Sequence, residues 1–460
     1  PQPITGTAAN ETLLGGFGND SILGLAGNDS IDGQAGSDTI DGGDGNDTLI
    51  GNYGDDSLLG GAGDDQLSDD QGSNVLDGGD GRDRLETRSL AGNHTLRGGT
   101  GNDFLIATGK TLNLDGGDGN DELNVNGYLL GTYVNAGVAT LSGGGGDDDI
   151  RISYFSQATL DGGLGNDYLY ADESRNLSMA GGAGEDSLYL RYNNYYSDYT
   201  DTSRQKPESY VLDGGADNDV LTAVGYSNSY DGQVFITIRG GSGDDSLTLI
   251  DIIAGKQSTG TANSGVSAAL LEGGDGNDSL WALGALQVTL TGGTGVDRFM
   301  LTAQQWYTLK AGNLSVNTES GYVTVQAKPV EITDFVVGSA GDVLDYSDLL
   351  RNASLTYNGS NPFSSGFLKL TQQGADTLLQ FDEDGSAANA ASLTTLAILK
   401  NVQATQLIAA NFNPNFNPNF PPDGLAVAPQ PITGTAANET LLGGFGNDSI
   451  LGLAGNDSID

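Results

Sequence analysis

From Gly15 onward the sequence repeats every nine residues, and this period restricts the chain to folds that are themselves repetitive. Six blocks follow one another without a gap: GGFGNDSIL, GLAGNDSID, GQAGSDTID, GGDGNDTLI, GNYGDDSLL and GGAGDDQLS. A weaker block precedes them at residues 6–14, and DDQGSNVLD follows before GGDGRDRLE resumes at Gly78. The phase holds throughout, so one structural unit is built again and again.

Each block has a glycine-rich half that must turn and a short half with one apolar residue between polar neighbours. Glycine at the first, second and fourth places permits the positive φ that a tight turn needs. The other half predicts a strand. Two blocks then close one coil, and successive coils stack as parallel strands about 4.8 Å apart. The predicted interior ladder consists of Ile22, Ile31, Ile40, Leu49, Leu58 and Leu67.

After Gly78 the glycine turns recur at wider and irregular intervals. Their first residues are Gly98, Gly116, Gly143, Gly162, Gly181, Gly214, Gly240, Gly273 and Gly292. We interpret this as a change from two turn-forming edges to one, in phase with the blocks at Gly24, Gly42 and Gly60. The opposite edge then accepts insertions, the longest of which lie in residues 190–213 and 248–272.

The acidic composition predicts a cationic partner. Asp and Glu number 61 against 18 Lys and Arg, which gives a net charge of -43. This balance excludes a nucleic-acid binder. Repulsion among the negative charges also opposes a compact state unless cations neutralise them. Carboxylate oxygens suit Ca²⁺, whereas one His and no Cys argue against zinc or iron. No run of 18 apolar residues occurs, so no membrane insertion is expected.

The blocks closely resemble the GGxGxDxUx pattern of the RTX, or hemolysin-type calcium-binding, family from Gly6 to about Met300. This resemblance implies that each sixth-place Asp binds Ca²⁺ together with carbonyl oxygens of its glycine turn and with the turn one coil away. The predicted ligands are Asp20, Asp29, Asp38, Asp47, Asp56, Asp65, Asp83, Asp103, Asp121, Asp148, Asp167, Asp186, Asp219, Asp245, Asp278 and Asp297. Roughly ten to fifteen ions are expected.

Some blocks depart from the pattern. Asn74 stands at the Asp place of DDQGSNVLD, His94 falls near that place in SLAGNHTLR, and the segment at Lys110 has no turn motif. We expect no full sites there. The block GGADNDVLT at Gly214 lacks the fourth-place glycine, so we expect strain at that turn.

The glycine motif stops at Leu301, where segments such as YVTVQA, LKLTQQ and TLLQFDEDG predict a compact β-rich domain. Residues 331–350 resemble the domain that closes many type I-secreted RTX proteins, and we expect this copy to cap the last coil. A spacer, NFNPNFNPNFPPDGLAVA, follows. Residues 429–460 are identical to residues 1–32, which indicates tandem copies of one unit.

The sequence thus predicts an all-β protein, a parallel β-roll or β-helix solenoid with calcium-binding turns, followed by a small β-rich capping domain. The predicted domains are a two-edged roll (1–86), a roll with one calcium-binding edge and insertions (87–300), the cap (301–410), the spacer (411–428) and the start of the next repeat (429–460).

The expected function is a calcium-stabilised structural unit of a giant secreted fibre, surface-layer or adhesin-like protein at the cell surface. Its expected partners are calcium ions, neighbouring copies of the unit and a cell-surface or matrix ligand, with no nucleic acid. No enzymatic activity is expected, because His94 is the only His and no GxSxG motif occurs. The alternative is an export and folding module of a secreted enzyme or toxin whose catalytic domain lies outside this chain.

Two aromatic clusters leave alternatives open. Tyr189, Tyr192, Tyr195, Tyr196 and Tyr199 form either an adhesive contact or part of an insertion that packs on its own roll. Phe412, Phe416 and Phe420 recur beside proline, and they either dock the spacer onto a neighbouring domain or punctuate a flexible linker.

Overall fold

The computed structural model describes residues 3–129, 132–133, 137–193, 208–227, 234–253, 268–283, 287–311, 313–318, 321–326, 328–353, 357, 359–385, 393–416, 431–433, 440–441, 449–451 and 458–459. The chain divides into two compact units, Pro1–Tyr226 with Asp231–Gly243, and Ser227–Tyr230 with Asp244–Asp460.

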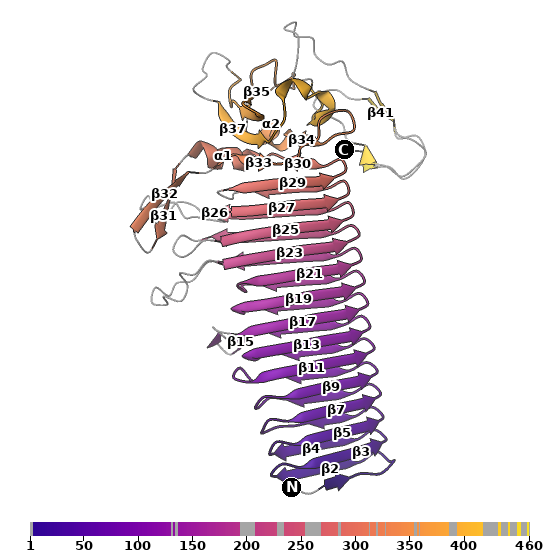
Figure 1. Cartoon of the computed structure of the whole chain (residues 1–460). Helices are drawn as coiled ribbons and strands as arrows, with labels where there is room; N and C mark the ends of the chain where they lie inside the picture. The colour runs from indigo at the N-terminus through magenta and orange to yellow at the C-terminus, as the bar shows by residue number, and fades with distance from the viewer. Residues whose placement is uncertain are drawn as a thin grey trace. The chain divides into compact units, whose positions relative to one another are not determined.

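The first unit consists of two parallel sheets whose strands alternate along the chain (Figure 1). One sheet contains β1 (Pro3–Thr5), β3 (Ser21–Ala26), β5 (Thr39–Asp44), β7 (Ser57–Ala62), β9 (Val75–Asp80), β11 (Asn93–Thr100), β13 (Thr111–Asp118), β17 (Val138–Gly145), β19 (Gln157–Leu164), β21 (Leu177–Ala183), β23 (Glu208–Ala216) and β25 (Val234–Ser242). The other contains β2 (Thr12–Phe17), β4 (Ser30–Ala35), β6 (Thr48–Ile50), β8 (Gln66–Asp69), β10 (Arg84–Thr87), β12 (Phe104–Ala107), β14 (Glu122–Asn126), β18 (Asp149–Ser153), β20 (Tyr168–Asp172), β22 (Ser187–Asn193) and β24 (Val220–Ser227).

The strand register confirms the predicted coil. Ile22 pairs with Ile40 and Ile31 with Leu49, so each coil lies directly over the next at the spacing of two blocks. The six residues of the predicted ladder are all buried. Because every coil presents its apolar residue at the same place, the interior is a continuous stack, and the predicted parallel β-roll is confirmed.

The coils widen from β11 onward, where one edge has lost its glycine turn. Each strand now contributes a second inward residue, as Leu112 does beside Leu114, and both are buried. His94 is the first member of this added column, because it pairs with Leu112.

The second unit repeats the two-sheet arrangement. One sheet contains β27 (Ala268–Asp275), β29 (Val288–Thr294), β33 (Val330–Ile332), β37 (Thr394–Leu399), β36 (Asp376–Phe381) and β35 (Leu368–Gln373), and the other contains β26 (Ser246–Ile253), β28 (Ser279–Leu283), β30 (Arg298–Met300), β34 (Val343–Asp345) and β38 (Phe412–Asn413). The remaining elements are α1 (Ala303–Ala311), α2 (Ser347–Ala353), β31 (Asn313–Thr318), β32 (Gly321–Gln326), β39 (Pro431–Thr433), β40 (Thr440–Leu441), β41 (Ser449–Leu451) and β42 (Ser458–Ile459), with β15 (Tyr128–Leu129) and β16 (Thr132–Tyr133) in the first unit. Two 3-10 helices, Ala404–Gln406 and Ala409–Asn411, precede β38.

The C-terminal β-rich region continues the two sheets of the coils in the second unit. Leu290 pairs with Ile332 and Phe299 with Leu344, so both sheets of the unit extend in parallel into this region. Only then does the chain change to the antiparallel strands β35, β36 and β37. Helices α1 and α2 are additions that the sequence patterns did not predict.

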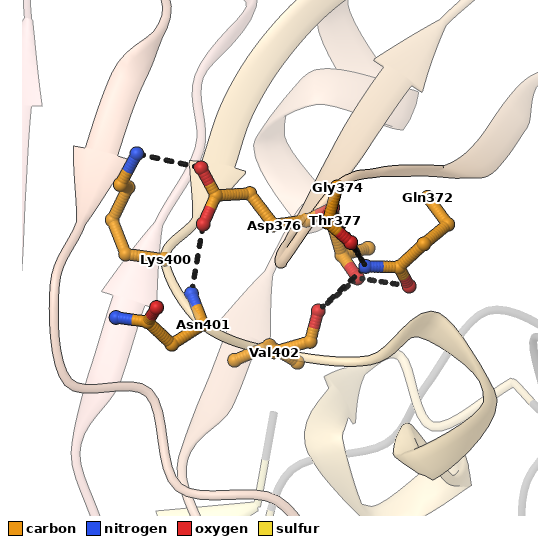
Figure 2. Close-up of polar contacts among 7 residues, drawn as sticks. All are labelled: Gln372, Gly374, Asp376, Thr377, Lys400, Asn401 and Val402. Atoms are coloured by element: carbon orange, nitrogen blue, oxygen red, sulfur yellow. Dashed lines mark hydrogen bonds and ion pairs between the residues drawn. The ribbon is translucent and has the colours of Figure 1, made fainter.

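A polar cluster fastens the antiparallel strands to the turn that follows β37 (Figure 2). Lys400 Nζ donates to Asp376 Oδ2 at 2.6 Å, and the Asn401 N–H donates to Asp376 Oδ1 at 2.9 Å. The hydrogen bond from Lys400 holds the pKa of Asp376 below its usual value. Thr377 Oγ1 donates to the Val402 carbonyl at 2.7 Å. Two neighbouring residues of β36, Asp376 and Thr377, therefore hold the turn that follows β37.

The predicted spacer begins later than expected. Phe412 lies in β38, pairs with Leu344 and is buried, and Phe416 is buried as well. The Phe412 ring packs against Tyr346, and the two ring centroids lie 6.0 Å apart. The compact region therefore extends to Phe416 rather than to residue 410.

Part of the tyrosine cluster lies within the described residues. Tyr192 is buried, with its ring centroid 5.5 Å from that of Tyr210, and Tyr189 stacks on Tyr170 at 5.6 Å. These two tyrosines pack on their own roll. Tyr195, Tyr196 and Tyr199, Phe420, and the central parts of both long insertions lie outside the described residues.

Candidate calcium-binding turns

The sixth-place aspartates line up along two edges of the coils. We call them the long edge and the short edge. In the first unit the long edge contains Asp29, Asp47, Asp65, Asp83, Asp103, Asp121, Asp148, Asp167, Asp186 and Asp219; in the second unit a corresponding edge contains Asp245, Asp278 and Asp297. The short edge contains Asp20, Asp38 and Asp56. All sixteen predicted side chains are buried. The structure therefore places every predicted ligand in a turn of one of these edges.

In most of these aspartates one carboxylate oxygen joins two coils. The N–H of Asp29 donates to Asp47 Oδ1 at 2.7 Å, and the N–H of Asp103 donates to Asp121 Oδ1 at 2.7 Å. The same hydrogen bond is present where a long insertion separates two turns: the N–H of Asp186 donates to Asp219 Oδ1 at 2.8 Å. The sixth place is thus kept in register even where neighbouring turns are far apart in sequence.

In thirteen of these aspartates the second carboxylate oxygen has no hydrogen-bond partner among the described residues. Among the described residues, Oδ2 is buried without a hydrogen bond in Asp29, Asp38, Asp47, Asp56, Asp65, Asp83, Asp103, Asp121, Asp148, Asp167, Asp186, Asp278 and Asp297. A buried carboxylate oxygen that lacks a donor is unfavourable by several kcal/mol unless a cation or proton compensates it. A repeated set of such atoms is the pattern expected of metal ligands.

These oxygens converge on the space beside the first-place glycine. A side-chain carbon added at Gly24 would lie 2.6 Å from Asp29 Oδ2 and closer still to the Gly42 carbonyl oxygen of the next coil. At Gly60 the same carbon would meet Asp65 Oδ2 and the Gly78 carbonyl, the latter at 2.5 Å. The missing side chain therefore leaves a cradle lined by a carboxylate and a carbonyl from two successive turns.

The fourth-place glycine sets the bend. Gly45 has a φ of 135°, and an added side-chain carbon would collide with the Gly27 carbonyl. In the Gly214 block, Asp217 occupies this place with a φ of 77°. A non-glycine residue in this region costs about 1–3 kcal/mol, which is the strain expected from the missing glycine.

Several of the buried aspartates have a raised pKa. Burial raises the pKa of Asp65, Asp83, Asp148 and Asp278 to about 7, and that of Asp121, Asp167, Asp186 and Asp297 to about 6. The N–H donated from the previous coil lowers each pKa, but it does not offset desolvation. A cation bound beside these carboxylates would offset the cost of desolvation at neutral pH.

The donor set fits Ca²⁺, which takes six to eight oxygen ligands at about 2.3–2.6 Å. Within the described ranges, no group of three or more His, Cys, Asp or Glu side chains converges. Carboxylates alone therefore do not complete a site there, and the stacked turns offer backbone carbonyls as the additional oxygens. The aspartates together with the glycine carbonyls of two turns would hold the ion and be bridged by it.

The short edge ends where the sequence departs from the pattern. The N–H of Asp56 donates to Asn74 Oδ1 at 3.0 Å, and the N–H of Asn74 donates to His94 Nδ1 at 3.3 Å. Both replacements accept the hydrogen bond from the previous coil but carry no carboxylate. Burial lowers the pKa of His94, which favours its neutral form.

Sequence reasoning missed residues at the start of the long edge in the first unit and at the end of the corresponding edge in the second unit. The N–H of Glu11 donates to Asp29 Oδ1 at 2.8 Å, so Glu11 begins the series. The N–H of Asp297 donates to Asp342 Oδ1 at 3.0 Å, and the N–H groups of Gly292 and Gly293 donate to Asp334. Asp342 could have been found, because Asp342-Val343-Leu344 repeats the spacing of Asp297-Arg298-Phe299.

Another acidic segment forms a local turn. The N–H of Asp384 donates to Asp382 Oδ1 at 3.4 Å, and Glu383 forms an ion pair with Lys310. Asp382 itself is buried.

Comparison with known proteins matches some of these turns; those of Asp121, Asp148, Asp186, Asp219 and Asp297 lie outside the matched ranges. A family model described as the RTX calcium-binding nonapeptide repeat matches residues 5–40, 32–67, 59–89, 90–109, 159–177, 237–249, 269–284 and 433–460. No curated protein matches the chain. In the described part of the chain, no helix is long and apolar enough to cross a membrane.

Proposed function

We propose that this chain, which carries RTX calcium-binding nonapeptide repeats, is a structural unit of a giant secreted fibre, surface-layer or adhesin-like protein. Its repeats bind calcium, and the module they form is structural. In this proposal the protein is extracellular, has no enzymatic activity and works through the stiffness that calcium gives to its coils.

The observation that carries the structural role is the repeated buried carboxylate with one unpartnered oxygen. Thirteen such oxygens occur among the described sixth-place aspartates, in register along the stack. A single functional site would need only one or two of them, whereas a ladder of sites makes folding of every coil depend on calcium. Under the proposal, the aspartates act as calcium ligands and roughly ten to fifteen ions bind.

The tandem repetition supports a role in an extended assembly. Residues 429–460 repeat residues 1–32, and Pro431 pairs with Ser449 just as Pro3 pairs with Ser21. The second copy thus begins a coil in the same register. In this proposal, neighbouring units join in series, and a cell-surface or matrix ligand binds along the assembly.

Electron microscopy of the native, calcium-loaded protein tests this proposal. The expected result is elongated particles with a longitudinal repeat that matches one unit of roll, cap and spacer. Isolated globular particles with a single roll would contradict it and favour the alternative, an export and folding module attached to a secreted enzyme or toxin.

A further inference from the structure

The short edge ends at a residue outside the nonapeptide pattern. The first-place column of this edge contains Gly15, Gly33 and Gly51, and Asp69 occupies the next position. The register is unbroken there, because Ile50 pairs with Ser68 immediately before this position. One coil further, Asp69 pairs with Thr87. An aspartate therefore stands where the three preceding turns have glycine.

The Asp69 side chain enters the turn. It is 1% exposed, and its Oδ1 accepts the Gln71 N–H at 3.1 Å. Its Oδ2 is buried and has no hydrogen-bond partner among the described residues, and the same holds for Asp56 Oδ2. A side-chain carbon added at Gly51 would lie 2.6 Å from Asp56 Oδ2 and closer to Asp69 Oδ2. Two unpartnered carboxylate oxygens thus face one cradle.

The preceding turn of the same edge shows what Asp69 replaces. At Gly33 the added carbon would lie 2.5 Å from Asp38 Oδ2 and 3.2 Å from the Gly51 carbonyl oxygen. One carboxylate and one carbonyl line that cradle. At Gly51 the second oxygen comes from a carboxylate instead, so the cradle carries two negative charges.

We propose that Asp69 and Asp56 together bind a calcium ion at the end of the short edge. The proposal rests on calcium binding by the other turns and adds a ligand that their pattern does not contain. Two carboxylates balance the charge of one divalent ion. Asn74 and His94 occupy the next two sixth places of this edge, so no sixth-place carboxylate follows Asp56. Asp69 thereby supplies the negative charge where the aspartate series stops.

Calcium stoichiometry of the full chain tests this site. We would measure bound calcium per chain by equilibrium dialysis for the wild-type protein, Asp69→Asn and Asp70→Asn. Asp70 is the exposed neighbour, so Asp70→Asn removes the same charge outside the cradle. The expected result is one ion fewer for Asp69→Asn and no change for Asp70→Asn. Equal stoichiometry in all three proteins would overturn the site.

Asp65→Asn separates this inference from the proposed function, because Asp65 is a sixth-place residue of the long edge. If Asp65→Asn loses calcium and Asp69→Asn does not, the Asp69 site fails alone. If neither loses calcium, the calcium-binding role of the turns fails as well.

If Asp69→Asn does not fold in saturating calcium, as judged by circular dichroism, crystals of the calcium-loaded wild-type protein decide. An anomalous peak between Asp56 Oδ2 and Asp69 Oδ2 would support the site. No peak there, with the other turns filled, would overturn it.

Discussion

Most sixth-place aspartates of the described chain use their two oxygens differently. Asp121 shows this: Oδ1 accepts the Asp103 N–H, whereas Oδ2 is buried and has no partner. Asn74 accepts the same kind of hydrogen bond, so the bond itself does not demand a carboxylate. The negative charge explains the preference for aspartate. Asparagine has one side-chain oxygen, whereas aspartate has a second, anionic oxygen that is available to a cation.

The raised pKa values predict how the metal-free protein responds to pH. An aspartate in an unfolded chain has a pKa of about 3.9. In the folded, metal-free chain burial raises the pKa of Asp121 to about 6 and that of Asp148 to about 7. Protonation therefore favours the folded state. The stability from this source is complete below about pH 4 and disappears as the pH rises through 6 to 7.

Calcium affinity should change in the opposite direction, because protons and calcium compete for the same oxygens. We expect affinity to fall severalfold between pH 8 and pH 5. Calcium titrations at several pH values, together with circular dichroism of the calcium-free protein, check both parts. An affinity that is constant over this range would show that the buried carboxylates are not the ligands.

The strand is the element that holds the coils together inside. Leu160 and Leu164 both lie in β19, but Leu160 is 1% exposed and Leu164 is 65% exposed. Leu160 pairs with Leu141 on one side and Met179 on the other, so its side chain is part of the continuous interior stack.

We therefore predict that Leu160→Ala lowers the free energy of unfolding by about 2–5 kcal/mol, the usual effect of removing a buried leucine. Leu164→Ala makes the same substitution in the same strand and should change it by less than about 0.5 kcal/mol. Denaturant unfolding in saturating calcium measures both. Equal effects would mean that the interior ladder does not govern stability.

For individual strands and helices, the sequence predicts the features that follow from the nine-residue period. It misses the features that depend on packing between residues far apart in the chain. The blocks set the coil register, the interior ladder and the loss of the short edge at Asn74 and His94. Helix α1 was missed because its position is fixed by distant contacts: Trp306 is buried against Phe381, with the rings 5.5 Å apart and edge to face. Phe412 was likewise assigned to the spacer, since pairing with β34 is not visible in sequence.

In the whole molecule, charge and repetition act together. The net charge of -43 opposes compaction, and the aspartates of successive coils lie close enough to raise one another's pKa, as Asp121 and Asp167 do for Asp148. Stability in such stacks is close to a sum of coil and neighbour contributions. Cations held between coils would relieve this repulsion at every layer at once.

Circular dichroism of the full chain with and without a calcium chelator at pH 8 tests the central claim most directly. The account predicts that excess chelator abolishes the β-strand signal of the coils and that added calcium restores it. A strand spectrum that stays unchanged in excess chelator would show that the acidic turns hold together without calcium.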